Sequence, residues 1–242
     1  MKRYVFAGLL VFLIVLLVSF PARVAYQWFA PPDVQLSGIS GSIWRGSAVE
    51  GLAGGAYLRD ISWRLHPAEL LTGKLAFTTS ASPASGTLHT DVALGLDGSL
   101  TLTDFSGNLP LDLVHQAFQQ EGISGDLSMQ FETLTLKNAL PVVAVGSVTV
   151  ANFYAPKLSA GVLGDYRADF QTTDSGITGN VDDLAGVLDI AGVITISPDR
   201  NYSLIGDVAT RPGAPPSIES QLRFLGSPDA RGMRPFRFEG QL

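Results

Sequence analysis

Residues 98–102 read GSLTL and residues 146–150 read GSVTV. In each, a glycine is followed by residues that alternate between polar and apolar, as in a β-strand with one apolar face. Glycine adopts the backbone conformations of turns and bulges freely, so it suits the start of such a strand. Repeated units of this kind predict a long antiparallel meander with one apolar and one polar face. Further copies of the unit lie at residues 73–77, 125–129, 186–190 and 192–196.

Two segments interrupt this pattern and predict short helices that cap the sheet. Residues 66–73, HPAELLTG, predict a helical turn that ends at glycine. Residues 110–122, PLDLVHQAFQQEG, predict a helix of about three turns with an apolar stripe toward the sheet. Leu111, Val114 and Phe118 form that stripe and are candidates for a lid or for the lining of a groove.

The C-terminal part of the chain predicts a loop and two further strands. Residues 211–217, RPGAPPS, are typical of a loop. Strands are expected at residues 218–225 and 236–242.

A charge-free apolar run lies near the N-terminus, where residues 4–20 read YVFAGLLVFLIVLLVSF. A helix of this length spans about 26 Å, close to the hydrocarbon core of a bilayer. A cleaved signal peptide is the alternative, but residues 21–25, PARVA, give no good small-x-small cleavage site. We therefore expect an uncleaved transmembrane anchor that includes Tyr4, Leu9, Leu13, Leu17 and Phe20.

The basic residues around the run predict its orientation. Lys2 and Arg3 precede it, and only Arg23 follows closely. The positive-inside tendency leaves a short cytoplasmic tip and exports the remainder. The aromatic residues between 26 and 29 suit the outer headgroup layer, and packing onto the exported domain is the alternative.

Length and composition limit the domain organisation and the class of protein. The chain has 242 residues, of which we assign 1–32 to the anchor unit and 33–242 to one exported β domain. A similarity between residues 38–43 and 122–127 suggests a subdivision near Leu109, with chance as its alternative. The absence of Cys excludes disulfides and thiol chemistry, and the net charge of −6 argues against a nucleic-acid partner.

The residues that could carry chemistry do not form a recognisable catalytic or metal-binding pattern. The three His, at positions 66, 89 and 115, lack metal-ligand spacing. Asp165, Asp169, Asp182 and Asp183 are close in sequence but lack the regular loop that calcium needs. No nucleophile–base pair can be assembled, so we expect no enzyme, catalytic residue, metal or cofactor.

Two Trp-Arg pairs are the most informative polar feature. Trp44-Arg45 lies in GSIWRG, residues 41–46, and Trp63-Arg64 follows on the next expected strand. Each pair puts a large aromatic side chain and a cation on opposite faces of a strand. Either both Trp residues pack in the core, or the four residues form a docking surface, since Trp and Arg are frequent at interface hot spots.

These segments resemble the type II secretion system protein N family. The resemblance covers about the first third of the chain and rests, after the apolar run, on residues 38–46, GISGSIWRG, 61–67, ISWRLHP, and 70–75, LLTGKL. It implies a single-pass inner-membrane accessory of the general secretion pathway with its bulk in the periplasm. It also implies other secretion-system proteins as partners, a role in assembly or stability of the export machinery, and no catalytic residues.

The order of elements is also similar, more faintly, to that of AsmA-like proteins. That resemblance implies an incurved sheet with an apolar inner face, and it suggests phospholipid as a second possible partner. The alternative function is therefore a periplasmic lipid-binding or lipid-transfer element. The expected fold is mainly β: a transmembrane helix followed by a strongly curved, mostly antiparallel half-open roll with one or two capping helices.

Overall fold

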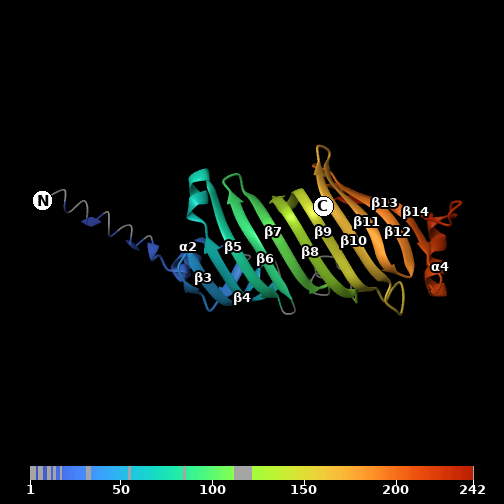
Figure 1. The fold of residues 1–242 in the computed structure, drawn as a ribbon, viewed down its shortest axis with the longest axis horizontal. Helices are drawn as coiled ribbons and strands as arrows, with labels where there is room; N and C mark the ends of the chain where they lie inside the picture. Colours follow the sequence, from blue (N-terminus) through green and yellow to red (C-terminus); the bar gives the residue numbers. More distant parts are fainter. Residues whose placement is uncertain are drawn as a thin grey trace.

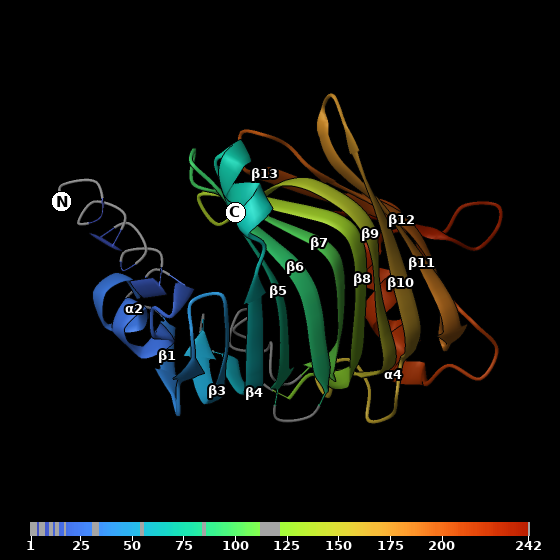
Figure 2. The same cartoon turned by 60° about the vertical axis from the view of Figure 1, so that its left-hand side comes forward.

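One antiparallel sheet dominates the computed structural model of the chain (Figures 1 and 2). From β3 to β14, strands that follow one another in sequence pair with one another, while β1 pairs with β3 and β2 pairs with the start of β3. The long antiparallel meander predicted from the alternating units is therefore confirmed. The structure describes residues 4, 8–9, 12, 15–16, 18–30, 34–53, 56–83, 86–111 and 122–241.

The strands lengthen toward the middle of the sheet. The first seven are β1 Val34–Ser37, β2 Ser40–Gly41, β3 Arg45–Ala53, β4 Ala56–Leu65, β5 Lys74–Pro83, β6 Thr87–Gly95 and β7 Ser99–Pro110. The others are β8 Ser124–Lys137, β9 Leu140–Tyr154, β10 Gly164–Thr173, β11 Gly176–Gly186, β12 Leu188–Ile196, β13 Asn201–Thr210 and β14 Arg234–Gln241.

The sheet is curved and open. Figure 2 shows the middle strands bending along their length. The edge strands β1 and β14 lie toward opposite ends of the molecule in Figure 1 and do not pair with each other. Each edge therefore has a neighbouring strand of the sheet on one side only.

One face of the sheet carries rows of apolar side chains that run across the strands. Phe77, Val92, Leu102, Leu134 and Ala144 lie opposite one another on the consecutive strands β5 to β9. Ala144 is buried, whereas the other four side chains are half-buried. The row holds neighbouring strands together by cross-strand apolar contact, yet it leaves part of its surface open.

Short helices lie at the margins of this sheet. α2 Ala22–Phe29 lies beside β2, and η1 Pro67–Thr72 lies beside β5. Gly73 follows η1 with φ 76° and ψ 23°, the left-handed conformation that glycine adopts most easily. The helical turn predicted at residues 66–73 is therefore confirmed.

The strand predicted at residues 218–225 is wrong. This segment forms the helices α4 Pro216–Leu222 and η3 Arg223–Leu225. Pro216 suits the first turn of a helix, and Ile218 packs against Ala155 and Leu163 in a buried cluster at the sheet. The following strand, β14, covers most of the predicted final strand.

Two expected helices fall wholly or partly outside the described residues. Of the segment 110–122, residues 112–121 are outside, so Val114 and Phe118 have no described position, and Leu111 is half-buried at the end of β7. Of the expected anchor, Tyr4 and Leu9 are helical and exposed, and Phe20 is half-buried; Leu13 and Leu17 are outside. Within the described part of the chain, no helix is both long enough and apolar enough to cross a bilayer.

Aromatic rings lie over glycines in the centre of the sheet. Phe131 packs between Phe105 and Phe170, with ring centroids 6.3 and 6.1 Å away. Gly146 lies opposite Phe131, and a Cβ atom on Gly146 would lie 2.8 Å from the Phe131 ring and 2.5 Å from its Cα. Glycine at position 146 is thus required by close approach of the neighbouring strand as well as by a bulge there.

We expect Gly146→Ala to destabilise the protein by about 2 kcal/mol or more, because the added methyl group must displace main-chain atoms of β8. Denaturant unfolding of the purified full-length chain, followed by tryptophan fluorescence, measures this change. Gly161→Ala is the matched control, since a Cβ atom there meets only Ser159 Oγ at 4.0 Å. Equal stability of the two variants would contradict the packing described for Gly146.

Candidate docking site

The first Trp-Arg pair lies directly beside the end of the expected anchor. Pro21 forms an isolated antiparallel bridge with Ser42, and the Ile43 amide donates to the Phe20 carbonyl at 3.1 Å. Trp44 follows, half-buried, and its carbonyl accepts a hydrogen bond of 2.8 Å from the Leu65 amide. The segment that enters β3 is therefore fixed both to the anchor end and to β4.

The two Trp-Arg pairs meet across the β3–β4 ladder. Arg45 lies opposite Arg64, and Gly46 lies opposite Trp63. The Trp63 ring covers Gly46 so closely that a Cβ atom on Gly46 would collide with its Cζ2 atom. Gly46 in the GSIWRG segment thus makes room for the second tryptophan. This gives Trp63 a packing role, whereas both Arg side chains are exposed.

Hydroxyl side chains continue the arginine-bearing face of these strands. Ser40 Oγ lies 2.9 Å from Ser47 Oγ, and Ser62 Oγ lies 2.7 Å from Ser80 Oγ on β5. His66 Nε2 lies 2.7 Å from a further hydroxyl oxygen, that of Thr78. The face is therefore polar along the whole row from β2 to β5, as the alternation predicts.

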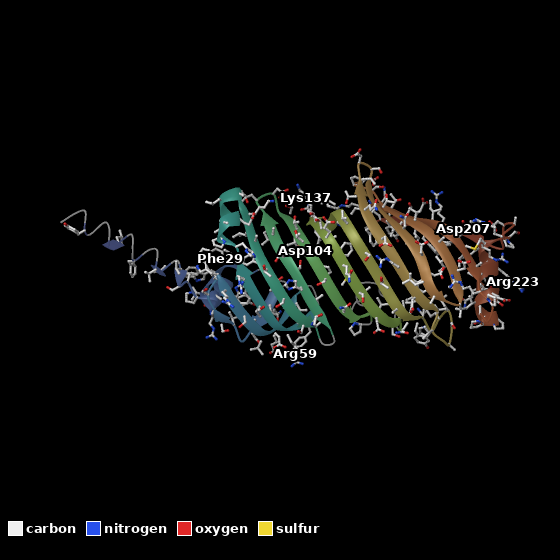
Figure 3. All side chains as sticks on the ribbon, viewed as in Figure 1. Phe29, Arg59, Asp104, Lys137, Asp207 and Arg223 are labelled. Carbon is white, nitrogen blue, oxygen red and sulfur yellow. The ribbon has the colours of Figure 1, made fainter. Side chains whose placement is uncertain are left out.

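Two of the aromatic side chains on α2 are exposed, whereas a third packs at the sheet edge. The Tyr26 hydroxyl donates to the Val34 carbonyl at 3.0 Å and accepts from the Leu36 amide at 2.9 Å, so Tyr26 belongs to the sheet edge. Trp28 and Phe29 are instead 67 % and 77 % exposed, and Figure 3 shows Phe29 at the outside of this end of the molecule. Their rings lie 6.3 Å apart, and the Phe20 ring lies 5.8 Å from that of Trp28. Trp28 and Phe29 thus remain largely exposed, and their expected place in the headgroup layer stays a prediction.

Three of the four acidic residues considered for a metal site, Asp165, Asp169 and Asp183, are used in separate contacts. Asp169 binds Arg167 at 2.7 Å, and the hydrogen bonds from this guanidinium hold the pKa of the Asp169 carboxyl below its usual value. Asp165 accepts from the main-chain amide of residue 152 at 2.7 Å. Over the described ranges of the chain, no group of three His, Asp or Glu could hold a metal ion.

Asp183 on β11 is buried and forms an ion pair with Arg211, which is partly exposed. Its side chain is 3 % exposed, and its Oδ2 lies 2.5 Å from Nη2 of Arg211. Oδ1 accepts from the Ile190 amide at 2.7 Å. Burial, together with the Asp183 charge, raises the pKa of Tyr166 to about 12. This group ties the loop after β13 to β11 and offers no nucleophile beside a base.

Of the three histidines, His66 binds the hydroxyl of Thr78 and His89 is exposed, whereas His115 is outside the described residues. The geometry thus brings together the four docking candidates, Trp44, Arg45, Trp63 and Arg64, at one end of the β3–β4 ladder. The outward pair Trp28–Phe29 lies on the helix beside that end and is the part that the docking hypothesis did not include.

Comparisons of the sequence with known proteins assign the chain to a family. The sequence model for "Type II secretion system (T2SS), protein N" matches residues 32–237. The type II secretion system protein N of Vibrio cholerae is 29 % identical to the chain over 258 aligned positions, which cover 100 % of both chains. That of Aeromonas hydrophila is 25 % identical and covers 94 % of this chain and 93 % of its own. No solved structure matches significantly. Because the family match spans nearly the whole sheet, the chain belongs to the type II secretion system protein N family.

Proposed function

We propose that the chain is a non-enzymatic accessory of the type II secretion system that assists assembly or stability of the export machinery. The observation that carries this proposal is the family match over residues 32–237, which includes every strand from β1 to β13 and the first half of β14. The described residues form surfaces suited to binding and do not form a recognisable reactive centre. Its partners are accordingly other proteins of the secretion system.

We further propose that residues 4–20 anchor the chain in the inner membrane, with the N-terminus in the cytoplasm and residues 33–242 as one periplasmic domain. The charge-free run and the position of Lys2 and Arg3 before it support this topology. The outward rings of Trp28 and Phe29, just after the run, suit the layer of lipid headgroups.

Two kinds of surface are suited to binding another protein. The edge strand β14 pairs with β13 on one side only, so a partner strand can add to its other side. Its Phe238 side chain is 57 % exposed and would give such a contact apolar area. The second surface is the end of the β3–β4 ladder, where Trp44 and Arg45 lie.

Deletion of the protein is expected to leave substrates folded in the periplasm but poorly secreted, because the export machinery would assemble or persist less well. Activity of a secreted enzyme in the periplasm and in the medium, with the abundance of the inner-membrane platform proteins, measures this effect. Expression of the full-length chain in the deletion strain is the control. Normal secretion together with normal platform abundance would contradict the proposal.

A second candidate function, lipid binding, is favoured by the half-buried apolar row on β5 to β9. In the described part of the chain, helices pack mainly at the sheet margins, with α2 beside β2, η1 beside β5 and α4 beside β13. An acyl chain laid along the row would bury methylene groups, each of which contributes about 0.8 kcal/mol. The predicted helix at residues 110–122 follows β7 and would be the lid of such a groove.

A photoreactive side chain in place of Leu134 is expected to give a phospholipid adduct in membranes, since Leu134 belongs to the apolar row. Thr135 is the matched control: it follows on the same strand and contacts the Thr101 hydroxyl on the opposite face, at 3.3 Å. Mass spectrometry of the illuminated, purified chain identifies the adduct. Absence of lipid at position 134, or equal labelling at positions 134 and 135, would remove the lipid-binding alternative.

A further inference from the structure

A basic depression lies on the polar face of a chain whose net charge is −6. It has a volume of about 280 Å³ and lies over β3 to β6. Its lining contains two arginines, one histidine and several hydroxyl side chains, but neither Asp nor Glu. The residues that matter here are Arg45, Ser62, Arg64, Thr78, Ser80 and His89.

The two arginines face each other without an acidic partner. Arg45 and Arg64 are directly opposite in the β3–β4 register, and both are exposed. Neither forms an ion pair with any carboxylate that the structure describes. Like charges placed opposite each other destabilise a pair of strands. An anion between the two guanidinium groups would remove that cost.

The neighbouring strand positions do not supply this anion. Arg64 lies opposite Thr78, and Thr78 lies opposite Asp91 on β6, so this carboxylate is two strands away, about 10 Å. At the other end of the β3–β4 ladder a cation lies opposite an anion, since Arg59 faces Glu50. The end beside the anchor is thus the place where two cations meet.

The hydroxyl groups in the depression add hydrogen-bond donors. In the Ser62–Ser80 pair, whose oxygens are 2.7 Å apart, one hydroxyl donates to the other, and the second proton is left for another acceptor. Guanidinium groups bind phosphate oxygens in pairs, and a phosphate group has several acceptor oxygens. The lining therefore fits a phosphate group better than a single carboxylate.

The position of the depression identifies the source of the phosphate. Ser42, which bridges to Pro21 at the end of the expected anchor, lies across the β2–β3 turn from Arg45 and donates its amide to the Arg45 carbonyl at 2.9 Å. We propose that Arg45 and Arg64, with Ser62, bind the phosphate of an anionic phospholipid headgroup at the outer surface of the membrane that holds the anchor. This inference rests on the proposed anchoring of residues 4–20.

The test uses the full-length chain in nanodiscs of phosphatidylcholine with a minority of phosphatidylglycerol. Native mass spectrometry after transfer to a mild detergent counts each lipid that stays bound. Wild-type protein is expected to retain phosphatidylglycerol in preference to phosphatidylcholine. In R45Q/R64Q the retained phosphatidylglycerol is expected to fall by about tenfold, because charge-assisted hydrogen bonds to phosphate are lost.

R59Q/R223Q is the matched control, since it removes the same charge from two exposed arginines outside the depression (Figure 3). Its lipid retention is expected to equal that of the wild type. Equal loss in both double variants, or a wild type without preference for phosphatidylglycerol, would overturn the proposal. Displacement of the wild-type lipid by millimolar inorganic phosphate would also overturn it, by assigning the site to free phosphate.

Flotation of the same wild-type protein with vesicles separates this inference from the proposed anchoring. A protein that floats at high pH and high salt without preferring phosphatidylglycerol keeps its anchor and refutes only the headgroup site. A protein that fails to float refutes both.

Discussion

The main-chain hydrogen bonds between consecutive strands are the constraint on which the rest of the structure depends. β8 pairs with β7 from Ser99↔Lys137 to Pro110↔Asp126 and with β9 along its other side. Within the described residues, neighbouring strands rather than a second layer satisfy most of the backbone groups of each strand. The side chains therefore lie on the two faces of the sheet. The alternating sequence places apolar groups on one face and polar groups on the other.

This single-sheet architecture is the physical basis of the proposed binding function. Charged groups on the polar face are mostly held in local contacts, such as Arg167 with Asp169 and Lys137 with Asp97. At the end beside the expected anchor, Arg45 instead faces Arg64, and the uncharged Trp28 ring is exposed nearby. The surfaces proposed for a lipid headgroup and for protein docking thus lie at that end, and the free edge of β14 lies at the other.

The sequence was sufficient to predict the meander, because alternation of period two survives in nearly every strand, and to predict η1 from Pro67 and Gly73. It was insufficient for α4, because the apolar residues Ile218, Leu222, Phe224 and Leu225 are spaced in a way that fits both a strand and a short helix. The helix buries Ile218 against Leu163, a residue from a distant part of the chain, and this contact is not visible in the local sequence. Glycine is required in the strands for two reasons that composition could not separate. Some glycines lie at bulges, and others, such as Gly46 and Gly146, lie beneath aromatic rings.

The central claim is that an exported chain forms one sheet in this register, and a pair of cysteines in a chain that has none tests it most directly. Thr101 on β7 lies opposite Thr135 on β8, with their hydroxyl oxygens 3.3 Å apart. T101C/T135C is predicted to form a disulfide in cells without added oxidant, whereas T101C/T133C, out of register, is not. Free thiols in T101C/T135C taken from cells, or preferential linkage of the out-of-register pair, would contradict the account.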